Sequence, residues 1–282
     1  MKALKPILIL CIAICFTTSC KKEVDMTVMQ KTLFENADIR QIEIGDAWQV
    51  TIVADTVTFV QVEYSAYLEN YLKTKLEGTK LEIGFTGNVY PVINSVYRAT
   101  VHTNHVTLFE KLEAKEAALV KCEGVFTFKG QQLELHLSDA AQCDGLIFLG
   151  ESCEIKMENA SLLTGFQFVG NTATAVLEDA SQFNGRIQVD ESLQVELNDA
   201  SRFVNKDGTT QQVLIKLQNS SLLNMAETEV QSMNVDLSSG SEATVHITGL
   251  LEGSLIEAST LFYKGHPLIQ VDCSDDSQLI PF

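Results

Sequence analysis

The chain has 282 residues, a formal net charge of −17 at pH 7 and a hydrophobic fraction of 45%. This length holds one large domain or two small ones, and four prolines and sixteen glycines are too few for a disordered, low-complexity chain. The negative charge repels phosphate backbones, so nucleic acid is not an expected partner.

The first residues have the pattern of a secretion signal. Two lysines precede an apolar run at residues 7–16, which is too short to span a bilayer but suits the central region of a signal peptide. The run ends at Thr17-Thr18-Ser19-Cys20, which resembles the lipobox of bacterial lipoproteins, although Thr17 stands where Leu is usual.

The lipobox resemblance implies that Cys20 is lipidated and becomes the first residue of the mature chain. Residues 1–20 are therefore interpreted as a lipoprotein signal peptide and residues 21–34 as a tether. The membrane is then a partner through the lipid anchor, and the expected location is the cell envelope, as an outer-membrane lipoprotein. The sequence does not decide between its periplasmic and surface-exposed sides.

Residues 35–105 are rich in strand patterns without an evident repeat. Apolar residues alternate with polar ones from Ile42 to Ile52, which favours a half-buried strand. Residues 66–73 are expected to form a short helix or turn, and Glu77-Gly78 is expected at the turn of a hairpin. Because an open solenoid end needs cover, this segment is predicted to cap the repeats that follow, joined edge-on to the first coils.

Residues 106–282 are dominated by one motif with a period of about twenty. A Ser or Ala recurs at the same place in every unit, with apolar residues six and four positions before it and two positions after it. This alternation predicts strands with one inward face, and a fixed period predicts stacked coils. The recurring positions are Ala141, Ser161, Ser181, Ser201, Ser221, Ser241, Ser259 and Ser277.

The predicted fold is an all-β parallel β-helix, a solenoid of about eight or nine coils of 18–23 residues, with the β-rich N-terminal cap. A weaker first coil is expected near residue 112. Each coil turns at an Asp or Asn followed by a small residue, which is expected to point inward. A second corner is predicted at the glycines Gly145, Gly165 and Gly185. A left-handed hexapeptide helix does not fit, because the apolar ladders do not recur every six residues.

Four cysteines fall within the predicted coils. Cys143, Cys153 and Cys273 occupy inward ladder positions, which predicts small core side chains. Cys122 and Cys143 lie in neighbouring coils, and both a disulfide and two free thiols are consistent with the sequence. No Cys or His spacing indicates a metal site, and no metal or cofactor is expected.

No catalytic residue is predicted. The acidic corner ladder, which includes Asp139, Asp179 and Asp199, is interpreted as a stack of turns because it occurs in every coil. Glu158 and Glu178 are neighbours on an outer face, where two carboxylates could share a proton or simply face solvent. A polysaccharide lyase or hydrolase therefore stays open only as a weaker alternative.

The leader, the Ile-x-Ile-Gly-x-Ala-Trp strand, the Leu-Glu-Gly-Thr-Lys-Leu-Glu-Ile hairpin and the Leu-x-Asp-Ala-Ser-x-Phe units together resemble a known family. Over residues 34–265 the chain is similar to the putative auto-transporter adhesin head GIN domain family. The resemblance implies a right-handed, single-stranded β-helix, an envelope location and no established biochemical activity. It supplies no catalytic residues.

Two functions from different classes remain. One is a non-catalytic binding or adhesion module for a glycan or surface protein, and the other is a rigid envelope scaffold. Contact residues are expected where the repeat is interrupted, because irregular loops with aromatic and polar side chains suit ligand binding. The candidate contact residues are Asn88, Tyr90, Tyr97, Arg98, Lys206 and Asp207.

Overall fold

The computed structural model describes residues 24–104, 109–127 and 132–282, and the regular elements of this part are strands apart from one short 3₁₀ helix. The signal peptide, Cys20 and the division predicted at residue 105 lie outside it. The N-terminal elements are β1 (Val28–Leu33), β2 (Gln41–Ile44), β3 (Gln49–Asp55), β4 (Phe59–Ser65), the 3₁₀ helix η1 (Ala66–Tyr71), β5 (Leu72–Glu77), β6 (Lys80–Phe85) and β7 (Tyr97–Asn104). Within the described ranges, no helix is long and apolar enough to cross a membrane.

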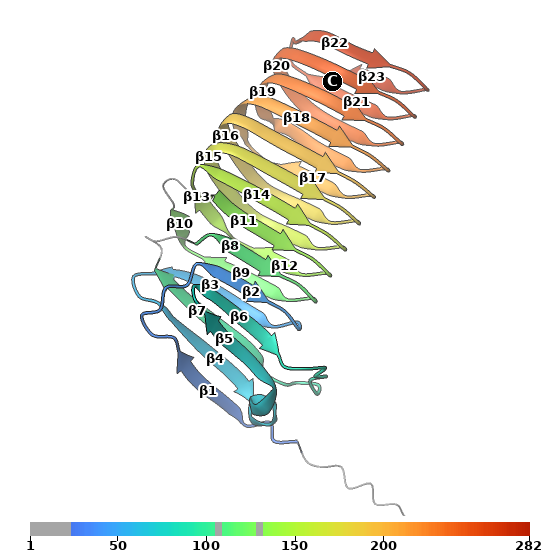
Figure 1. Ribbon diagram of the computed structural model, residues 1–282. Helices are drawn as coiled ribbons and strands as arrows, with labels where there is room; N and C mark the ends of the chain where they lie inside the picture. The colour runs from blue at the N-terminus through green and yellow to red at the C-terminus, as the bar shows by residue number, and fades with distance from the viewer. Residues whose placement is uncertain (1–23, 105–108, 128–131) are drawn as a thin grey trace, which may run out of the picture.

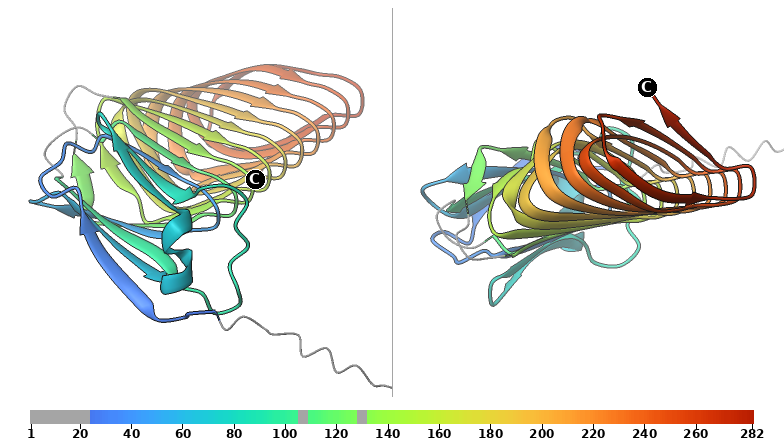
Figure 2. Two further views of the ribbon diagram at one scale, coloured as in Figure 1. Left: turned by 60° about the horizontal axis from the view of Figure 1, so that its bottom comes forward. Right: turned by 90° about the horizontal axis from the view of Figure 1, so that it is seen from above.

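The remaining strands belong to the stacked coils. They are β8 (Lys111–Ala114), β9 (Leu119–Glu123), β10 (Val125–Thr127), β11 (Gln132–Leu137), β12 (Gln142–Asp144), β13 (Ile147–Leu149), β14 (Ser152–Met157), β15 (Leu162–Leu177), β16 (Gln182–Leu197), β17 (Arg202–Asn205), β18 (Gly208–Leu217), β19 (Leu222–Leu237), β20 (Glu242–Leu255), β21 (Thr260–Lys264), β22 (Leu268–Cys273) and β23 (Gln278–Pro281). Figure 1 shows them stacked into a rod that rises from the N-terminal elements, and Figure 2 shows the coils from two further sides.

Parallel pairing between successive coils confirms the predicted solenoid. Through the middle of the rod a residue lies beside the one twenty positions on, as when Leu135 pairs with Ile155 and Ile155 with Ala175. The strands before the recurring Ser or Ala form one sheet, here face A: β6, β2, β8, β11, β14, the C-terminal parts of β15, β16, β18, β19 and β20, and β22. The strands after it form face B: β7, β3, β9, β12, the N-terminal parts of β15, β16, β19 and β20, and β17, β21 and β23.

A tight turn joins face A to face B in every coil. In the turn of Ser138 to Ala141, the two central residues Asp139 and Ala140 have φ of 52° and 61°, and the Ala141 amide donates to the Ser138 carbonyl at 3.0 Å. Two positive φ angles define a type I′ turn, which explains the Asp or Asn at the first position. The expectation that the small second residue points inward is wrong: Ala140 is exposed, because the turn directs it to solvent.

The second corner is confirmed in two coils and differs in the third. Gly145 and Gly165 have positive φ, as predicted. Gly185 does not, but a Cβ there would lie 2.6 Å from the Phe166 carbonyl oxygen. Glycine is needed at Gly185 because the backbone of the preceding coil passes too close for any side chain.

The inward ladders form one continuous core along the rod. Phenylalanines stack from coil to coil, with ring centroids 4.4 Å apart for Phe183 and Phe203 and 5.6 Å apart for Phe148 and Phe168. Each fully buried side chain of this size contributes roughly 1.5–3 kcal/mol through the hydrophobic effect. Repeated in every coil, this burial holds the rod together.

The cysteine predictions are confirmed at two of three ladder positions. Cys143 and Cys153 are buried, whereas Cys273 is exposed. Cys273 ends β22, which pairs with β20, and no later coil of the described chain stacks on β22. Cys122 and Cys143 are buried free thiols.

The N-terminal segment contains a coil that its sequence position does not suggest. β2 and β3 lie parallel to β8 and β9, with Ile42 beside Leu112 and Val50 beside Val120. A type I′ turn joins them, as in the repeats, and Trp48 takes the place of the recurring Ser or Ala. The segment was expected to be non-repetitive; its repeat unit was missed because a buried Trp replaces the small residue.

This coil is inserted out of sequence order. On the side away from β8 and β9, β2 pairs with β6 and β3 pairs with β7. The chain therefore forms β6 and β7 on one side of the inserted coil and then returns to its other side, where β8 begins the regular repeat. The antiparallel strands β4 and β1 extend the layer from β7, and β5 pairs with β6 in the predicted hairpin. η1 confirms the helix or turn expected near residue 66.

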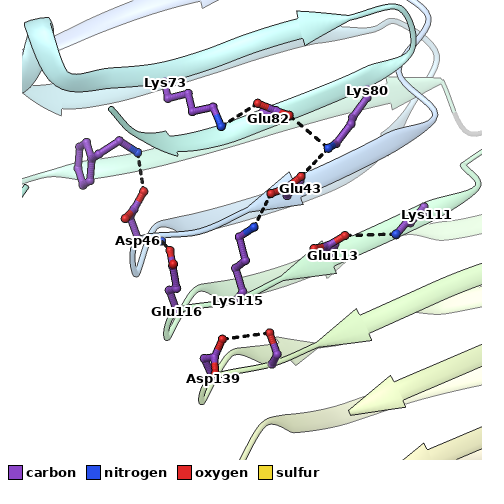
Figure 3. A network of polar contacts seen from close by, with 12 residues as sticks. Glu43, Asp46, Lys73, Lys80, Glu82, Lys111, Glu113, Lys115, Glu116 and Asp139 are labelled. Atoms are coloured by element: carbon purple, nitrogen blue, oxygen red, sulfur yellow. Dashed lines mark hydrogen bonds and ion pairs between the residues drawn. The ribbon is translucent and has the colours of Figure 1, made fainter. Parts of the chain in front are cut away.

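A chain of alternating charges joins these layers across face A (Figure 3). Lys73 and Lys80 both contact Glu82, at 2.9 and 3.2 Å, and Lys80 also contacts Glu43 at 2.5 Å. Lys115 donates to Glu43 at 2.5 Å from the turn after β8. The network therefore connects the β5–β6 hairpin, the inserted coil and the first coil of the regular repeat.

Candidate functional site

The acidic corner ladder is part of the turn structure. Asn159 donates its side-chain amide to Asp139 at 3.0 Å, and Asn219 donates to Asp199 at 2.9 Å. These hydrogen bonds link the turns of neighbouring coils, so both carboxylates have a structural role. In the described ranges, no group of three or more His, Cys, Asp or Glu residues is arranged to hold a metal ion.

Glu158 lies beside two basic side chains. Its carboxylate lies 2.5 Å from Lys156 Nζ and 3.6 Å from His136 Nε2. The hydrogen bond from Lys156 lowers the pKa of Glu158, and the Lys156 charge acts in the same direction against a smaller effect of burial. A carboxylate with a lowered pKa stays ionised, which is unlike the general acid of a glycan hydrolase.

Four of the six predicted contact residues belong to one region, the loop between β6 and β7 and the start of β7. Asn88 and Tyr90 are exposed on the loop. Tyr97 instead packs inward, with its ring 6.0 Å from that of Trp48. Arg98 projects from face B and donates to Glu63 at 2.6 Å.

Lys206 and Asp207 lie apart from that region, in the turn between β17 and β18. Six coil steps separate β7 from β17 along face B, or roughly 29 Å at about 4.8 Å a step. The structure therefore does not bring the six candidates together into one site.

The β17–β18 turn is organised by a buried asparagine. Asn205 accepts a hydrogen bond from the Ile187 amide at 2.6 Å and donates to the Ile187 carbonyl at 3.0 Å and to the Thr228 hydroxyl at 2.9 Å. These bonds fix the turn against the coils on both sides. The interruption of the repeat here has a structural cause.

Arg98 also lines a shallow hollow of about 500 Å³ on face B. Its other lining side chains include Thr51, Lys121 and Gln142. Arg98 is paired with Glu63, and Lys121 is paired with Glu123 at 2.7 Å. Both positive charges are thus already neutralised by the protein.

A larger site lies on face A, in the last coils of the rod. Two hollows of about 550 and 340 Å³ share Gln212 and Ser232 in their walls. We call their combined surface the amide groove. Its lining residues are Ser192, Leu193, Gln194, Gln211, Gln212, Val213, Leu214, Gln231, Ser232, Asn234, Gly249, Leu250, Glu252, Leu268 and Gln270.

The amide groove forms where the coil length changes from twenty to eighteen residues. The pairing of β19 with β20 shifts twice. Opposite Met225–Glu229, β20 has three residues fewer than β19, and between Ile247 and Leu250 it has one residue more, so the coil is two residues shorter. At the second shift, a Cβ on Gly249 would lie 2.4 Å from the Gln231 carbonyl oxygen. Glycine is needed at Gly249 because the Gln231 carbonyl of the neighbouring coil passes too close for a side chain.

The groove is almost free of charge on a strongly acidic protein. Among its lining residues only Glu252 is charged, and its carboxylate accepts from the Asn234 amide at 3.2 Å. Gln194, Gln212 and Asn234 are exposed and offer amide donors and acceptors. Leu214 and Leu268 add apolar surface, with 46% and 65% of their area exposed.

Sequence reasoning missed the amide groove. The signal was present in two places: the spacing of the recurring serines falls from twenty to eighteen after Ser241, and the outward positions at Gln194, Gln212 and Ser232 lack the charges found elsewhere on the coils. Each signal is weak alone, because an uncharged outward residue is common on any strand. Their coincidence in space appears only in the folded rod.

The described part of the chain is a β-solenoid with an amide-lined groove in which Glu252 is the single charged lining residue. The family model described as "Putative auto-transporter adhesin, head GIN domain" matches residues 38–267, and the chain belongs to this family. The predicted resemblance is confirmed. No curated protein matches the chain.

Solved structures share the fold at low sequence identity. A "putative adhesin" from Parabacteroides merdae is 14% identical with a TM-score of 0.63, and a "putative lipid binding protein" from Parabacteroides distasonis is 15% identical with a TM-score of 0.64. A second "putative adhesin" from Parabacteroides distasonis is 16% identical with a TM-score of 0.55. Each likeness covers 92% of this chain and 98% of the other, and it extends to the fold alone.

Proposed function

We propose that the protein is a non-catalytic adhesion-type module of the cell envelope that binds a neutral glycan in the amide groove. The observation that carries this proposal is the groove itself: two adjoining amide-lined hollows with a single charged lining residue, Glu252, on a protein with a net charge of −17. Membership of the adhesin head family and the names of its structural neighbours support the adhesion-type class.

The chemistry of the groove favours hydroxyl-rich, uncharged ligands. Glutamine and asparagine side chains both donate and accept hydrogen bonds, so they can match sugar hydroxyls without bringing a charge. Leu214 and Leu268 provide apolar area for the less polar faces of a sugar ring. An anionic glycan would meet the negative field of the whole protein and bind more weakly.

The groove also has the dimensions of a binding site. Together its two hollows fall within the size range of ordinary ligand pockets. They lie side by side across successive strands spaced about 4.8 Å apart, which suits an extended chain lying across the coils. The paired charges of the face B hollow make that surface a weaker candidate.

Anchoring through Cys20 remains part of the proposal. The chain begins its described part at Val24, so a lipidated Cys20 would hold the rod close to the membrane by its N-terminal end. The sequence pattern of the leader supports this anchor and an envelope location.

An array of neutral, sialylated and sulfated glycans tests the proposed ligand class. The purified protein is expected to bind members of the neutral group and to leave the charged groups empty. Preference for anionic glycans would contradict the proposal. Absence of binding to every glycan would favour the alternative of a rigid envelope scaffold.

A further inference from the structure

Three segments meet at η1, at the end of the rod opposite the amide groove. The Tyr67 amide donates to the Asp25 carbonyl at 3.2 Å, where the described chain begins. The Tyr67 hydroxyl accepts from the Val92 amide at 2.8 Å, in the loop between β6 and β7. One tyrosine therefore connects the entry of the chain to this loop.

The loop is held at both of its ends by the same helix. The Thr86 amide donates to the Tyr71 carbonyl at 2.7 Å, and the Ser95 hydroxyl lies 2.5 Å from the Tyr67 hydroxyl. The tip between these attachments projects from the protein. Figures 1 and 2 show the β6–β7 loop and η1 together at this end of the molecule.

The tip of the loop carries exposed apolar side chains. Tyr90 has 86% of its area exposed and Ile93 has 85%, with Val92 beside them at 46%. Val24 is also exposed at the chain entry. The nearest carboxylate of η1, Glu69, is paired with Lys31 at 2.7 Å, so its charge is balanced.

We propose that this end of the rod rests on a lipid bilayer, with Tyr90, Val92 and Ile93 inserted at the level of the headgroups. The inference rests on the lipid anchor of the proposed function, because Cys20 is four residues before Val24 and would bring the bilayer to the chain entry. Tyrosine prefers the membrane interface, and exposed aliphatic groups gain by leaving water. A second contact beside the anchor fixes the orientation of the rod.

This seating would place the amide groove away from the membrane. On face A, seven coil steps lead from β6 to β18, or roughly 34 Å at about 4.8 Å a step. The loop and the groove then have complementary roles, one holding the base and the other facing outward. Tyr90, predicted as a ligand contact, is thereby assigned to the membrane and not to the ligand.

Site-specific labelling of the full lipidated chain tests whether the loop tip inserts into the bilayer. Cys273→Ser removes the exposed thiol, and Ile93→Cys then carries an environment-sensitive fluorophore in phosphatidylethanolamine–phosphatidylglycerol vesicles with spin-labelled lipid. Leu222→Cys, an exposed leucine on β19 of face B, is the matched control. We expect strong quenching and a blue shift at residue 93, and neither at residue 222.

The outcomes separate the anchor from the seating. A chain that floats with the vesicles but shows the same quenching at residues 93 and 222 would overturn the seating alone. A chain that stays out of the vesicle fraction would overturn the anchor and the seating with it. Neither result affects the glycan array, which reports on the groove independently.

Discussion

Lys115 donates to Glu43 at 2.5 Å, although 72 residues separate them in the sequence. The contact crosses from the turn after β8 to β2, the strand that the chain inserts beneath its own first regular coil. Lys80 binds the same carboxylate from β6, on the opposite side of β2. Glu43 is therefore the point at which three layers of different sequence origin are joined.

Glu43→Gln is expected to remove an acid-sensitive part of the stability. Burial raises the pKa of Glu43, but the hydrogen bonds and charges of Lys115 and Lys80 outweigh it and lower the pKa to about 2. A carboxylate with a lowered pKa in the folded state stabilises the fold above its unfolded pKa of about 4.5, and this contribution is lost as the pH falls toward 2.

At 1.4 kcal/mol per pKa unit the effect is at most on the order of 3 kcal/mol, and screening at the partly exposed lysines reduces it to roughly 1–2 kcal/mol. Urea unfolding at pH 7 and at pH 3 measures it. Wild type should lose more stability than Glu43→Gln between these pH values. Glu242→Gln, on the exposed side of face B, should behave like wild type; equal pH dependence in all three chains would refute the role of Glu43.

The four cysteines of the coils are expected to differ in reactivity. Cys273 is exposed and should react with maleimide in the folded protein. Cys122, Cys143 and Cys153 are buried; a hydrogen bond with Cys143, followed by burial, raises the pKa of Cys122, and burial raises that of Cys153. These three should react only after denaturation, as peptide mapping by mass spectrometry would show.

No disulfide between Cys122 and Cys143 is expected. Cys143 pairs with Val120, so Cys122 is its diagonal neighbour. Diagonal neighbours in a sheet lie about 7–8 Å apart, beyond the usual Cα separation for a disulfide. A Cys122–Cys143 crosslink found in non-reducing digests of protein from its native compartment would contradict this expectation.

Asn205→Ala is expected to destabilise the rod by about 2–3 kcal/mol, because it leaves the buried Ile187 amide and the Thr228 hydroxyl without their partner. Lys206→Ala changes the adjacent exposed residue and should shift the unfolding free energy by less than about 0.5 kcal/mol. Chemical denaturation of the two variants makes the comparison. Similar losses in both would mean that the turn depends on more than its buried amide.

The regular part of the fold was open to prediction because each coil carries the same local signals. The alternating ladder and the Asp-Ala pair at Asp179-Ala180 specify a strand, a type I′ turn and an inward face without reference to distant residues. The exposed Ala180 was placed on the wrong side, because the sequence does not show that both central residues of the turn have positive φ.

The inserted coil was harder to predict because its partners are distant in the sequence. Ile42, Ile44 and the Asp46-Ala47 pair fit the repeat, but Trp48 stands where every later coil has Ser or Ala. Its identity as a coil depends on pairing with β6 and β8, which the local pattern does not encode.

The candidate site was missed for a related reason. A single interruption of the repeat, such as Lys206-Asp207, is visible in a sequence and was predicted to bind a ligand. In the structure this interruption belongs to a turn that the buried Asn205 organises. A groove arises instead from several ordinary residues, such as Gln212 and Asn234, brought beside a shortened coil. That combination depends on the register between coils.

The most direct test of the central claim is a binding titration of the amide groove with a neutral glycan from the array. The double variant Gln212→Ala/Asn234→Ala removes two exposed amides from the groove, and Gln182→Ala removes a matched exposed amide from face B. Losing about 1.4 kcal/mol or more of hydrogen bonding should weaken binding at least tenfold in the double variant and leave Gln182→Ala unchanged. Equal affinity in all three proteins would show that the glycan binds elsewhere and would contradict the account.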